Sequence, residues 1–251
     1  PQISIGHQYL FLHRDFEFPE KNGVNLWLLR FFTRLTCIGA NEKLALSFRA
    51  MDDDDEAHIR VVPPLLRKEV LSCESTKGDY LHGYMVNFGF GENIKKWHNS
   101  HPEVPLHFFW DKQDEDEVCH VDDTLSFHQL DDLKFLRYMS GCKAYATTAG
   151  FESVCEAMYL GKPLLMVPAH IEQDCNAYDA ARTGAGIVAD AFDLENLLEF
   201  ANTYQPDISF RYWVHSCDWR ILRNIEIGLS LAHYPAPSFP YSYSNMPDMA
   251  L

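Results

Sequence analysis

The stretch Thr147–Ala177, TTAGFESVCEAMYLGKPLLMVPAHIEQDCNA, carries the pattern that decides the fold. An apolar strand is predicted at Lys143–Ala146, and small residues then lead into a helix that opens at Gly150. A second strand is predicted at Pro163–Val167, followed by a polar loop and another helix. This order predicts an α/β fold with a Rossmann-like parallel sheet flanked by helices. Two of its loops follow the carboxyl ends of strands, where such sheets bind ligands.

The first of these loops and its helix predict a nucleotide site. Small residues before a helix let backbone N–H groups approach a phosphate, and the helix dipole favours its charge. Gly150 and Ser153 lie where backbone and hydroxyl donors would meet a diphosphate. Glu156 lies under two turns further on, within reach of both hydroxyls of a nucleotide ribose. An ordinary N-cap turn followed by an exposed glutamate is the alternative interpretation.

The same residues resemble the nucleotide-sugar signature of GT-B glycosyltransferases. In plant UDP-glycosyltransferases it reads Thr-His-Cys-Gly-Trp-Asn-Ser-x-x-Glu, then Gly-x-Pro, a later Pro, and Asp-Gln-x-x-Asn. The peptidoglycan GlcNAc transferase and archaeal-type putative glycosyltransferases are similar over this span. The corresponding residues here are Thr147, Thr148, Ala149, Gly150, Phe151, Glu152, Ser153, Glu156, Gly161, Pro163, Pro168, Glu172, Gln173 and Asn176.

Two departures from the signature affect the phosphate end. Thr148 replaces the usual phosphate-binding His, and Glu152 replaces an Asn. A Thr hydroxyl can still donate to a phosphate oxygen. A Glu beside a diphosphate would repel it unless the side chain points away.

The resemblance implies a role for each matched residue. Thr148, Gly150 and Ser153 would bind the diphosphate, and Glu156 the ribose. Glu172 and Gln173 would bind the hydroxyls of the transferred sugar, although a polar loop before any helix would look the same. The nucleotide base would lie beside Phe127, His128 and Gln129, with His128 as a donor contact. We expect Asn176 to cap or pack rather than to touch the donor.

The resemblance also implies a reaction, the inverting transfer of a hexose from a nucleoside-diphosphate sugar, expected to be a UDP-sugar, to an acceptor of unknown identity. Neither a cofactor nor a metal ion is expected. Asp114–Asp116 matches an Asp-x-Asp metal motif, but its place inside the acidic run Asp111–Glu117 favours a solvated loop. The catalytic base is expected in the part of the N-terminal domain that this sequence lacks, and His7 is the candidate in the part that is present. His170 lies on the donor side.

The resemblance predicts a domain division as well. Residues 1–76 would be a remnant of the N-terminal acceptor-side domain with the linker, hinged at Pro63-Pro64. Residues 77–231 would be the C-terminal nucleotide-sugar-binding domain, and residues 232–251 an irregular tail. The chain is therefore interpreted as an N-terminally truncated fragment that binds nucleotide but is inactive alone.

Hydrophobic patterning predicts further elements on both sides of the linker Ser72–Lys77. Strands are predicted at Ile3–Ile5, Leu35–Ile38, Leu46–Phe48, Ile59–Val62, Tyr80–Val86, Leu106–Trp110, Val118–His120, Thr124–His128 and Gly184–Val188. Helices are predicted at Asn25–Leu35, Glu92–Asn99, Asp131–Ser140, Leu194–Tyr204 and Tyr212–Leu231.

Composition limits the partners and the compartment. A net charge of −15 argues against nucleic acid, because binding its phosphates needs a basic surface. The acidic run Asp52–Glu56 is expected to be a solvated loop. Seven cysteines without any Cys-x-x-Cys fit a reduced, cytoplasmic protein. Neither a signal peptide nor a membrane-spanning run is visible in the sequence.

Two other functions and one surface remain open. A hydrolysing sugar-nucleotide 2-epimerase shares the fold and a similar ribose-binding Glu, and a non-catalytic donor-binding subunit would keep only this half of the site. The apolar residues Trp27, Leu28, Leu29, Phe31 and Phe32 stand beside Arg30 and Arg34. They could meet the inner face of a membrane that carries a lipid-linked acceptor or a surface glycan. A core helix is the favoured interpretation.

Overall fold

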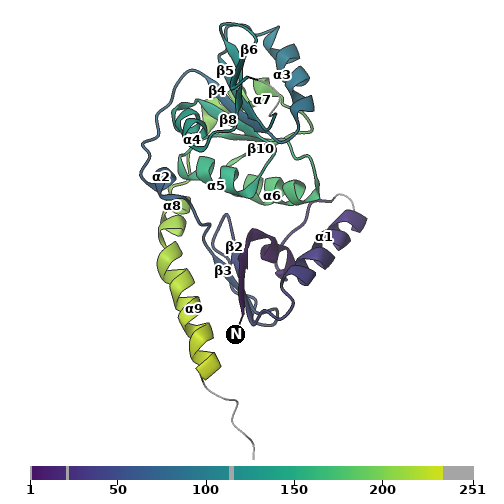
Figure 1. Cartoon of the computed structure of the whole chain (residues 1–251), viewed down its shortest axis with the longest axis vertical. Helices are drawn as coiled ribbons and strands as arrows, with labels where there is room; N and C mark the ends of the chain where they lie inside the picture. The colour runs from purple at the N-terminus through teal and green to yellow at the C-terminus, as the bar shows by residue number, and fades with distance from the viewer. Residues whose placement is uncertain (1, 21–22, 113–115, 234–251) are drawn as a thin grey trace, which may run out of the picture.

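The computed structural model describes residues 2–20, 23–112 and 116–233, which form two parallel sheets with helices between and around them (Figure 1). The smaller sheet has the order β1-β2-β3 and is parallel throughout. Its strands are β1 (Ile3–Gly6), β2 (Glu42–Leu46) and β3 (Ile59–Val62). With the 3₁₀ helix η1 (His7–Leu12) and α1 (Gly23–Thr36), it is called the N-terminal layer below.

The larger sheet has seven strands in the order β10-β9-β8-β4-β5-β7-β6. All neighbours are parallel except β6 and β7. The strands are β4 (Leu81–Met85), β5 (Leu106–Trp110), β6 (Val118–His120), β7 (Leu125–Gln129), β8 (Ala144–Thr147), β9 (Leu164–Met166) and β10 (Gly186–Val188). The predicted α/β class and parallel sheet are confirmed.

Helices cover both faces of the larger sheet and enclose two cores. On one face lie α3 (Gly91–His98), preceded by the short 3₁₀ helix η2 (Phe88–Phe90), and α7 (Leu194–Thr203). On the other lie α4 (Asp132–Gly141), α5 (Phe151–Tyr159) and α6 (Ile171–Arg182). The core under α5 and α6 continues into the N-terminal layer, so these two helices lie between the sheets (Figure 1).

The C-terminal helices return to the N-terminal layer. One helix was predicted at Tyr212–Leu231, but the structure has α8 (Ile208–His215) and α9 (Cys217–His233). The break falls at Ser216. Both its backbone N–H and its hydroxyl donate to the Trp213 carbonyl, over 3.1 and 2.7 Å. The Trp213 indole N–H donates to the Ser47 carbonyl over 3.0 Å. Beyond this anchor, α9 runs down beside β3 (Figure 1).

Sequence patterning was less accurate in the N-terminal layer. The strand predicted at Leu35–Ile38 is wrong, because α1 extends to Thr36 and a turn follows. The strand predicted at Leu46–Phe48 begins earlier, at Glu42, and ends at Leu46. Neither η1 nor the short helix α2 (Lys68–Leu71), which precedes the expected linker, was predicted.

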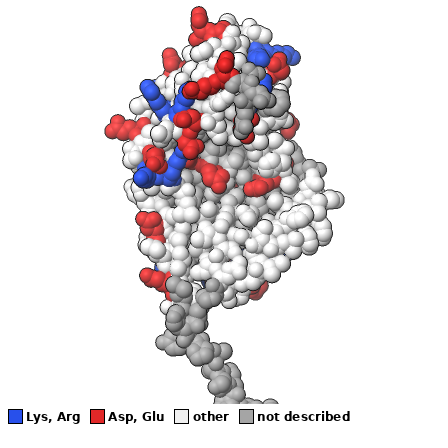
Figure 2. All heavy atoms as spheres, viewed as in Figure 1, with Lys and Arg blue, Asp and Glu red and all other residues white. Residues whose placement is uncertain are grey.

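Helix α1 exposes most of its apolar residues, so the expectation of a core helix is wrong. The indole of Trp27 is 61% exposed and the ring of Phe32 is 59% exposed. Only one side of the helix packs on the body, through Leu26, Leu29 and Thr33. The face in Figure 2 is almost free of charged side chains at its lower right, where Figure 1 places α1.

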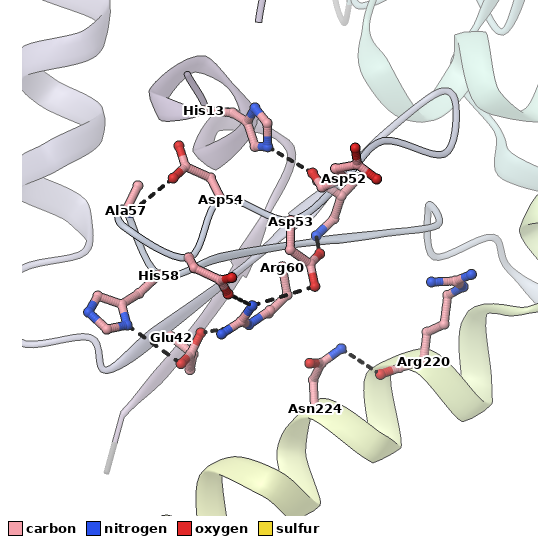
Figure 3. A network of polar contacts seen from close by, with 12 residues as sticks. His13, Glu42, Asp52, Asp53, Asp54, Ala57, His58, Arg60, Arg220 and Asn224 are labelled. Carbon is pink, nitrogen blue, oxygen red and sulfur yellow. Dashed lines mark hydrogen bonds and ion pairs between the residues drawn. The ribbon is translucent and has the colours of Figure 1, made fainter. Parts of the chain in front are cut away.

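In the acidic run Asp52–Glu56, every acidic residue except Asp54 is exposed, as expected for a solvated loop (Figure 3). Asp54 is 2% exposed, and its carboxylate accepts the backbone N–H groups of Arg14 and Ala57 over 3.0 and 3.1 Å. The guanidinium of Arg60 bonds Asp55 and lies 3.5 Å from Asp53. The excess charge is therefore partly neutralised within the fold.

Two expectations fall partly outside the described residues: the Asp114–Asp116 motif and the tail 232–251. All seven cysteines carry free thiols. Among the helices that the structure describes, none has both the length and the apolarity needed to cross a bilayer.

Candidate functional site

Two loops leave the same edge of the larger sheet and end in helix N-termini. Thr148-Ala149-Gly150 joins β8 to α5, and residues 167–170 join the neighbouring strand β9 to α6. Ala149 has φ 63°, a left-handed conformation that costs a non-glycine residue on the order of 1 kcal/mol. This turn places Gly150 at the N-cap of α5, where no side chain bonds the first N–H groups. His170 occupies the same position on α6, also without a side-chain cap.

A cleft of about 490 Å³ lies where these loops face the N-terminal layer. It brings together four predicted site residues, Gly150, Glu172, Gln173 and His7. The full lining is Ile5, Gly6, His7, Gln8, Leu46, Leu65, Gly150, Phe151, Glu152, His170, Glu172, Gln173 and Asn176. The lining holds two carboxylates and neither Lys nor Arg, so the helix N-termini are its main positive groups.

His7 forms part of the cleft wall and is held on three sides. Its Nδ1 lies 2.7 Å from the Leu46 carbonyl oxygen, and its Nε2 lies 2.9 Å from Asn176 Oδ1. The imidazole stacks on the ring of Phe151, with the centroids 3.8 Å apart. Burial lowers the pKa of His7 to about 4, against the opposing effect of its two hydrogen bonds and of Glu152. The imidazole is therefore neutral at pH 7. Because both neighbouring atoms are acceptor oxygens, its single N–H donates to only one of them.

Asn176 and Gln173 hold the loops in place. The Asn176 amide, 1% exposed, has its Oδ1 2.9 Å from His7 Nε2 and donates through Nδ2 to the carbonyl oxygen of Ala149 over 3.2 Å. It thus links the N-terminal layer to the strained turn before α5. Gln173 Oε1 accepts the backbone N–H of Ala169 over 2.9 Å, which orders the start of α6. Both of these side-chain amides, Gln173 and Asn176, belong to α6.

Glu156 lies on α5 outside the lining of the cleft, and a cation covers its carboxylate. The Arg67 guanidinium donates to it twice, Nε to Oε1 over 2.7 Å and an Nη to Oε2 over 3.1 Å. The Glu156 side chain is 10% exposed. Burial raises the pKa of Glu156, and the hydrogen bonds and charge of Arg67 act to lower it. Arg67 was missed at the sequence level.

Thr148 and Ser153 lie at the phosphate loop without lining the cleft. The Thr148 side chain is fully buried, and its hydroxyl oxygen has no hydrogen-bond partner among the described residues. The Ser153 hydroxyl donates to the Gly150 carbonyl over 3.2 Å, within the first turn of α5. In this conformation both side chains support the loop from inside.

His128 lies away from the cleft, on the sheet face that α4 covers. It is 2% exposed, its Nε2 is 2.9 Å from Ser126 Oγ, and its ring stacks on Phe109 with centroids 4.8 Å apart. Burial lowers its pKa to about 4, with Lys134 and His107 acting in the same direction. Strand alternation explains the placement, since the side chain points across the sheet and not beyond its edge.

A second cavity, of about 460 Å³, opens at the opposite edge of the larger sheet. Its lining includes Lys77, Lys143, Lys162 and Arg211. The Lys162 amine donates to the carbonyls of Thr76 and Cys142, which joins the linker to the end of α4. Among the described residues, His, Cys, Asp and Glu side chains do not gather in any set of three that could hold a metal ion.

Comparisons with solved structures show the fold that this geometry indicates. The glycotransferase of kitacinnamycin superposes with a TM-score of 0.53 at 14% identity, over 76% of this chain and 55% of its own. Spinosyn forosaminyltransferase SpnP gives 0.53 at 15% identity, over 91% and 70%. LpCGTa in complex with UDP gives 0.52 at 13% identity, over 87% and 60%. The chain thus has the GT-B glycosyltransferase fold and spans little more than half the length of two of these neighbours.

A family model gives the sequence-level relationship. No curated protein matches the chain. The model described as glycosyl transferase family 1 matches residues 1–203, which include both sheets and the cleft between them. The chain therefore belongs to glycosyl transferase family 1.

Proposed function

We propose that the chain binds the nucleoside-diphosphate part of a sugar donor in this cleft, as the donor-binding half of an inverting, metal-independent hexosyltransferase. The observation that carries the proposal is the convergence of two uncapped helix N-termini, at Gly150 and His170, on one cleft. Backbone N–H groups at such ends bind phosphate without a basic side chain. A UDP-sugar is the favoured donor, since LpCGTa is in complex with UDP.

The proposed chemistry is a single displacement at the anomeric carbon. An acceptor hydroxyl oxygen forms the new bond as the bond to the β-phosphate oxygen breaks, and the hydroxyl proton passes to a base. The leaving diphosphate gains negative charge beside the α5 N-terminus. Fixed N–H dipoles at that point stabilise the developing charge, which is electrostatic preorganisation.

We assign the diphosphate and sugar of the donor to the cleft, and the nucleoside to the neighbouring gap between α4 and α5. The backbone at Gly150 would hold the diphosphate, with Ser153 and Thr148 fixing the loop. Glu172 and Gln173 would bind the sugar hydroxyls, and Glu156 the ribose hydroxyls. No donor contact is assigned to His128, because α4 covers it.

The base is the least complete part of the proposed site. His7 is neutral at pH 7, but its Nε2 lies 2.9 Å from Asn176 Oδ1 and its Nδ1 lies 2.7 Å from the Leu46 carbonyl oxygen, so protein atoms cover both nitrogens. These contacts favour a positioning role for His7 and a base supplied from outside the described residues. We therefore expect this chain alone to bind nucleotide and to transfer sugar poorly, which equally fits a donor-binding subunit.

A thermal-shift panel with UDP, dTDP, GDP and ADP tests the proposal. One nucleotide should raise the melting temperature, and Glu156→Ala should abolish that rise. Glu103→Ala, which alters an exposed carboxylate away from the cleft, should preserve it. The absence of a shift with all four nucleotides would contradict the proposal, as would an undiminished shift in Glu156→Ala.

We also propose that α1 rests on a membrane surface, which would bring a lipid-linked acceptor to the cleft. Helix α1 exposes Val24, Trp27, Leu28, Phe31, Phe32 and Leu35 and carries Arg30 and Arg34 without any acidic residue. Aromatic residues flanked by arginines suit the headgroup region of an anionic bilayer.

Sedimentation with phosphatidylserine-containing vesicles tests this contact. The wild type should co-sediment, and the triple variant Trp27→Ser, Phe31→Ser, Phe32→Ser should remain in the supernatant. Tyr212→Ser, at an exposed aromatic on α8, is the matched control and should co-sediment. Equal sedimentation of all three proteins would refute the contact.

A further inference from the structure

The carboxylate of Glu156, which we propose binds ribose, is already occupied by hydrogen bonds from Arg67. Arg67 bonds both oxygens of Glu156, over 2.7 and 3.1 Å, in the bidentate geometry that makes such pairs specific. A nucleotide ribose presents two hydroxyls that would need the same two oxygens. With the Glu156 side chain only 10% exposed, the carboxylate has little open surface on which to accept them as well.

Arg67 also reaches across to the helix beside Glu156. A second Nη of its guanidinium lies 3.4 Å from the carbonyl oxygen of Asp132, at the start of α4. The guanidinium therefore spans the gap between the beginning of α4 and the middle of α5. In the proposed site this gap receives the nucleoside, because the loop after β7 leads into α4 and Glu156 faces it from α5.

The segment that carries Arg67 joins the two layers. Arg67 is the N-cap of α2 and follows the Pro63-Pro64 pair at the end of β3. Helix α2 lies beside α5 (Figure 1). Leu65, two residues before Arg67, lines the cleft. A movement of the Arg67 backbone away from α5 would therefore carry α2 and Leu65 with it.

We infer that Arg67 is a displaceable latch on the nucleoside subsite, so that the ribose of the donor takes over Glu156 and Arg67 withdraws with the linker. This inference rests on the proposed function. Arg67 is the outer member of the pair, with its side chain 28% exposed, so on leaving Glu156 it returns to water. The ribose hydroxyls then supply the hydrogen bonds that the buried carboxylate requires.

The latch makes a quantitative prediction for affinity. Only molecules in which Arg67 has left Glu156 can bind the ribose. If these are a fraction of all molecules, the apparent dissociation constant equals the intrinsic one divided by that fraction. Arg67→Gln should therefore bind the nucleotide about tenfold more tightly than the wild type, by calorimetry with the member of the UDP, dTDP, GDP and ADP set that gives the largest thermal shift. Arg67→Lys, which cannot form the bidentate pair, should lie between them. Lys68→Gln, at the exposed neighbouring cation, should bind as the wild type does.

Hydrogen exchange is a second test. If the ion pair were purely structural, nucleotide would not speed the exchange of the N–H groups beside Arg67. The N–H groups of Val70 and Leu71 bond to the Arg67 carbonyl over 3.1 and 3.3 Å. Nucleotide should speed their exchange in the wild type while it slows exchange at residues 148–153.

The outcomes separate the latch from the function on which it rests. If Glu156→Gln removes nucleotide binding but Arg67→Gln weakens it or leaves it unchanged, the latch is wrong and the proposed function stands. If neither the wild type nor Arg67→Gln binds any nucleotide, both are wrong. Slower exchange at Val70 and Leu71 on binding would also overturn the latch, since the linker would then tighten instead of withdrawing.

Discussion

The two ends of the predicted donor site are joined to the rest of the chain in different ways. At the phosphate end, Asn176 bonds His7 and the Ala149 carbonyl, and all of these groups are buried. At the ribose end, Glu156 is bonded to Arg67, whose side chain is partly open to solvent. Buried partners leave unpaired groups when separated, whereas a partly solvated guanidinium can return to water.

This difference indicates which contact is fixed and which is exchangeable. The phosphate end resembles a core, because breaking it would cost hydrogen bonds that neither water nor ligand can replace. The ribose end can open, because ribose hydroxyls offer Glu156 a replacement for Arg67. The following variants test the distinction, from the largest expected effect on stability to the smallest.

Asn176→Ala should destabilise the chain most. The change leaves the Ala149 carbonyl and His7 Nε2 buried without their partner, which costs about 2–4 kcal/mol in the free energy of unfolding. Urea denaturation measures the loss. Glu172→Ala, in the same cleft but without a buried bond, should change stability by less than about 0.5 kcal/mol. Equal losses for the two variants would show that Asn176 is not a fixed contact.

Acid should weaken the phosphate end through His7. Burial lowers the pKa of His7 from 6.5 to about 4, so between these values the unfolded state binds a proton that the folded state does not. Stability is therefore retained above about pH 6.5 and lost as the pH falls towards 4. The His7 share is about 3 kcal/mol by linkage. His7→Gln should reduce the slope of unfolding free energy against pH in that window, and an unchanged slope would contradict the burial of this imidazole.

Arg49→Ala should have an intermediate effect on the contact between the N-terminal layer and α6. Arg49 lies 3.0 Å from Asp179, which is 1% exposed, and its loss leaves that carboxylate unpaired at a cost of about 1–3 kcal/mol. Burial already raises the pKa of Asp179, and Arg49 opposes that rise. The loss of stability caused by Arg49→Ala should therefore be largest above the folded-state pKa of Asp179, where this carboxylate is charged, and should shrink as the pH falls. Adding Asp179→Asn should recover part of the loss, and a pH-independent penalty would exclude this cause.

Arg67→Gln should cost the least stability. The Glu156 carboxylate is more exposed than that of Asp179, and a Gln amide at position 67 keeps a donor for it, so the loss should be about 1 kcal/mol. Thermal unfolding without nucleotide measures this value, with Lys68→Gln as the control. A loss as large as that of Asn176→Ala would place Arg67 among the fixed contacts and remove the contrast between the two ends.

Much of the larger sheet could be predicted from sequence because its strands are buried apolar runs. The prediction at Leu106–Trp110 matches β5, and that at Thr124–His128 matches β7 to within one residue. The loop at Gly150 could be predicted because small residues between a strand and a helix are typical of a turn that leads into a helix N-terminus. The N-terminal layer was harder, since the exposed face of α1 has the apolar composition of a core helix.

The side-chain environment of the site could not be predicted from local patterns. Arg67 and Glu156 are 89 residues apart, and nothing in either segment specifies the other. His128 lies near the end of the expected strand, yet strand alternation turns it under α4 instead of towards the donor. Spacing thus located the loops, while the contacts between layers decided which side chains are open.

The most direct test of the account is the position of the bound nucleotide. A photoreactive azido-base analogue of whichever nucleotide gives the largest thermal shift can be cross-linked to the chain and mapped by mass spectrometry. If the nucleoside lies between α4 and α5, the analogue should label residues 129–135 or 65–67, around Arg67 and Glu156. An excess of the unmodified nucleotide should prevent this labelling. Labelling confined to the cavity lined by Lys77, Lys143, Lys162 and Arg211 would contradict it.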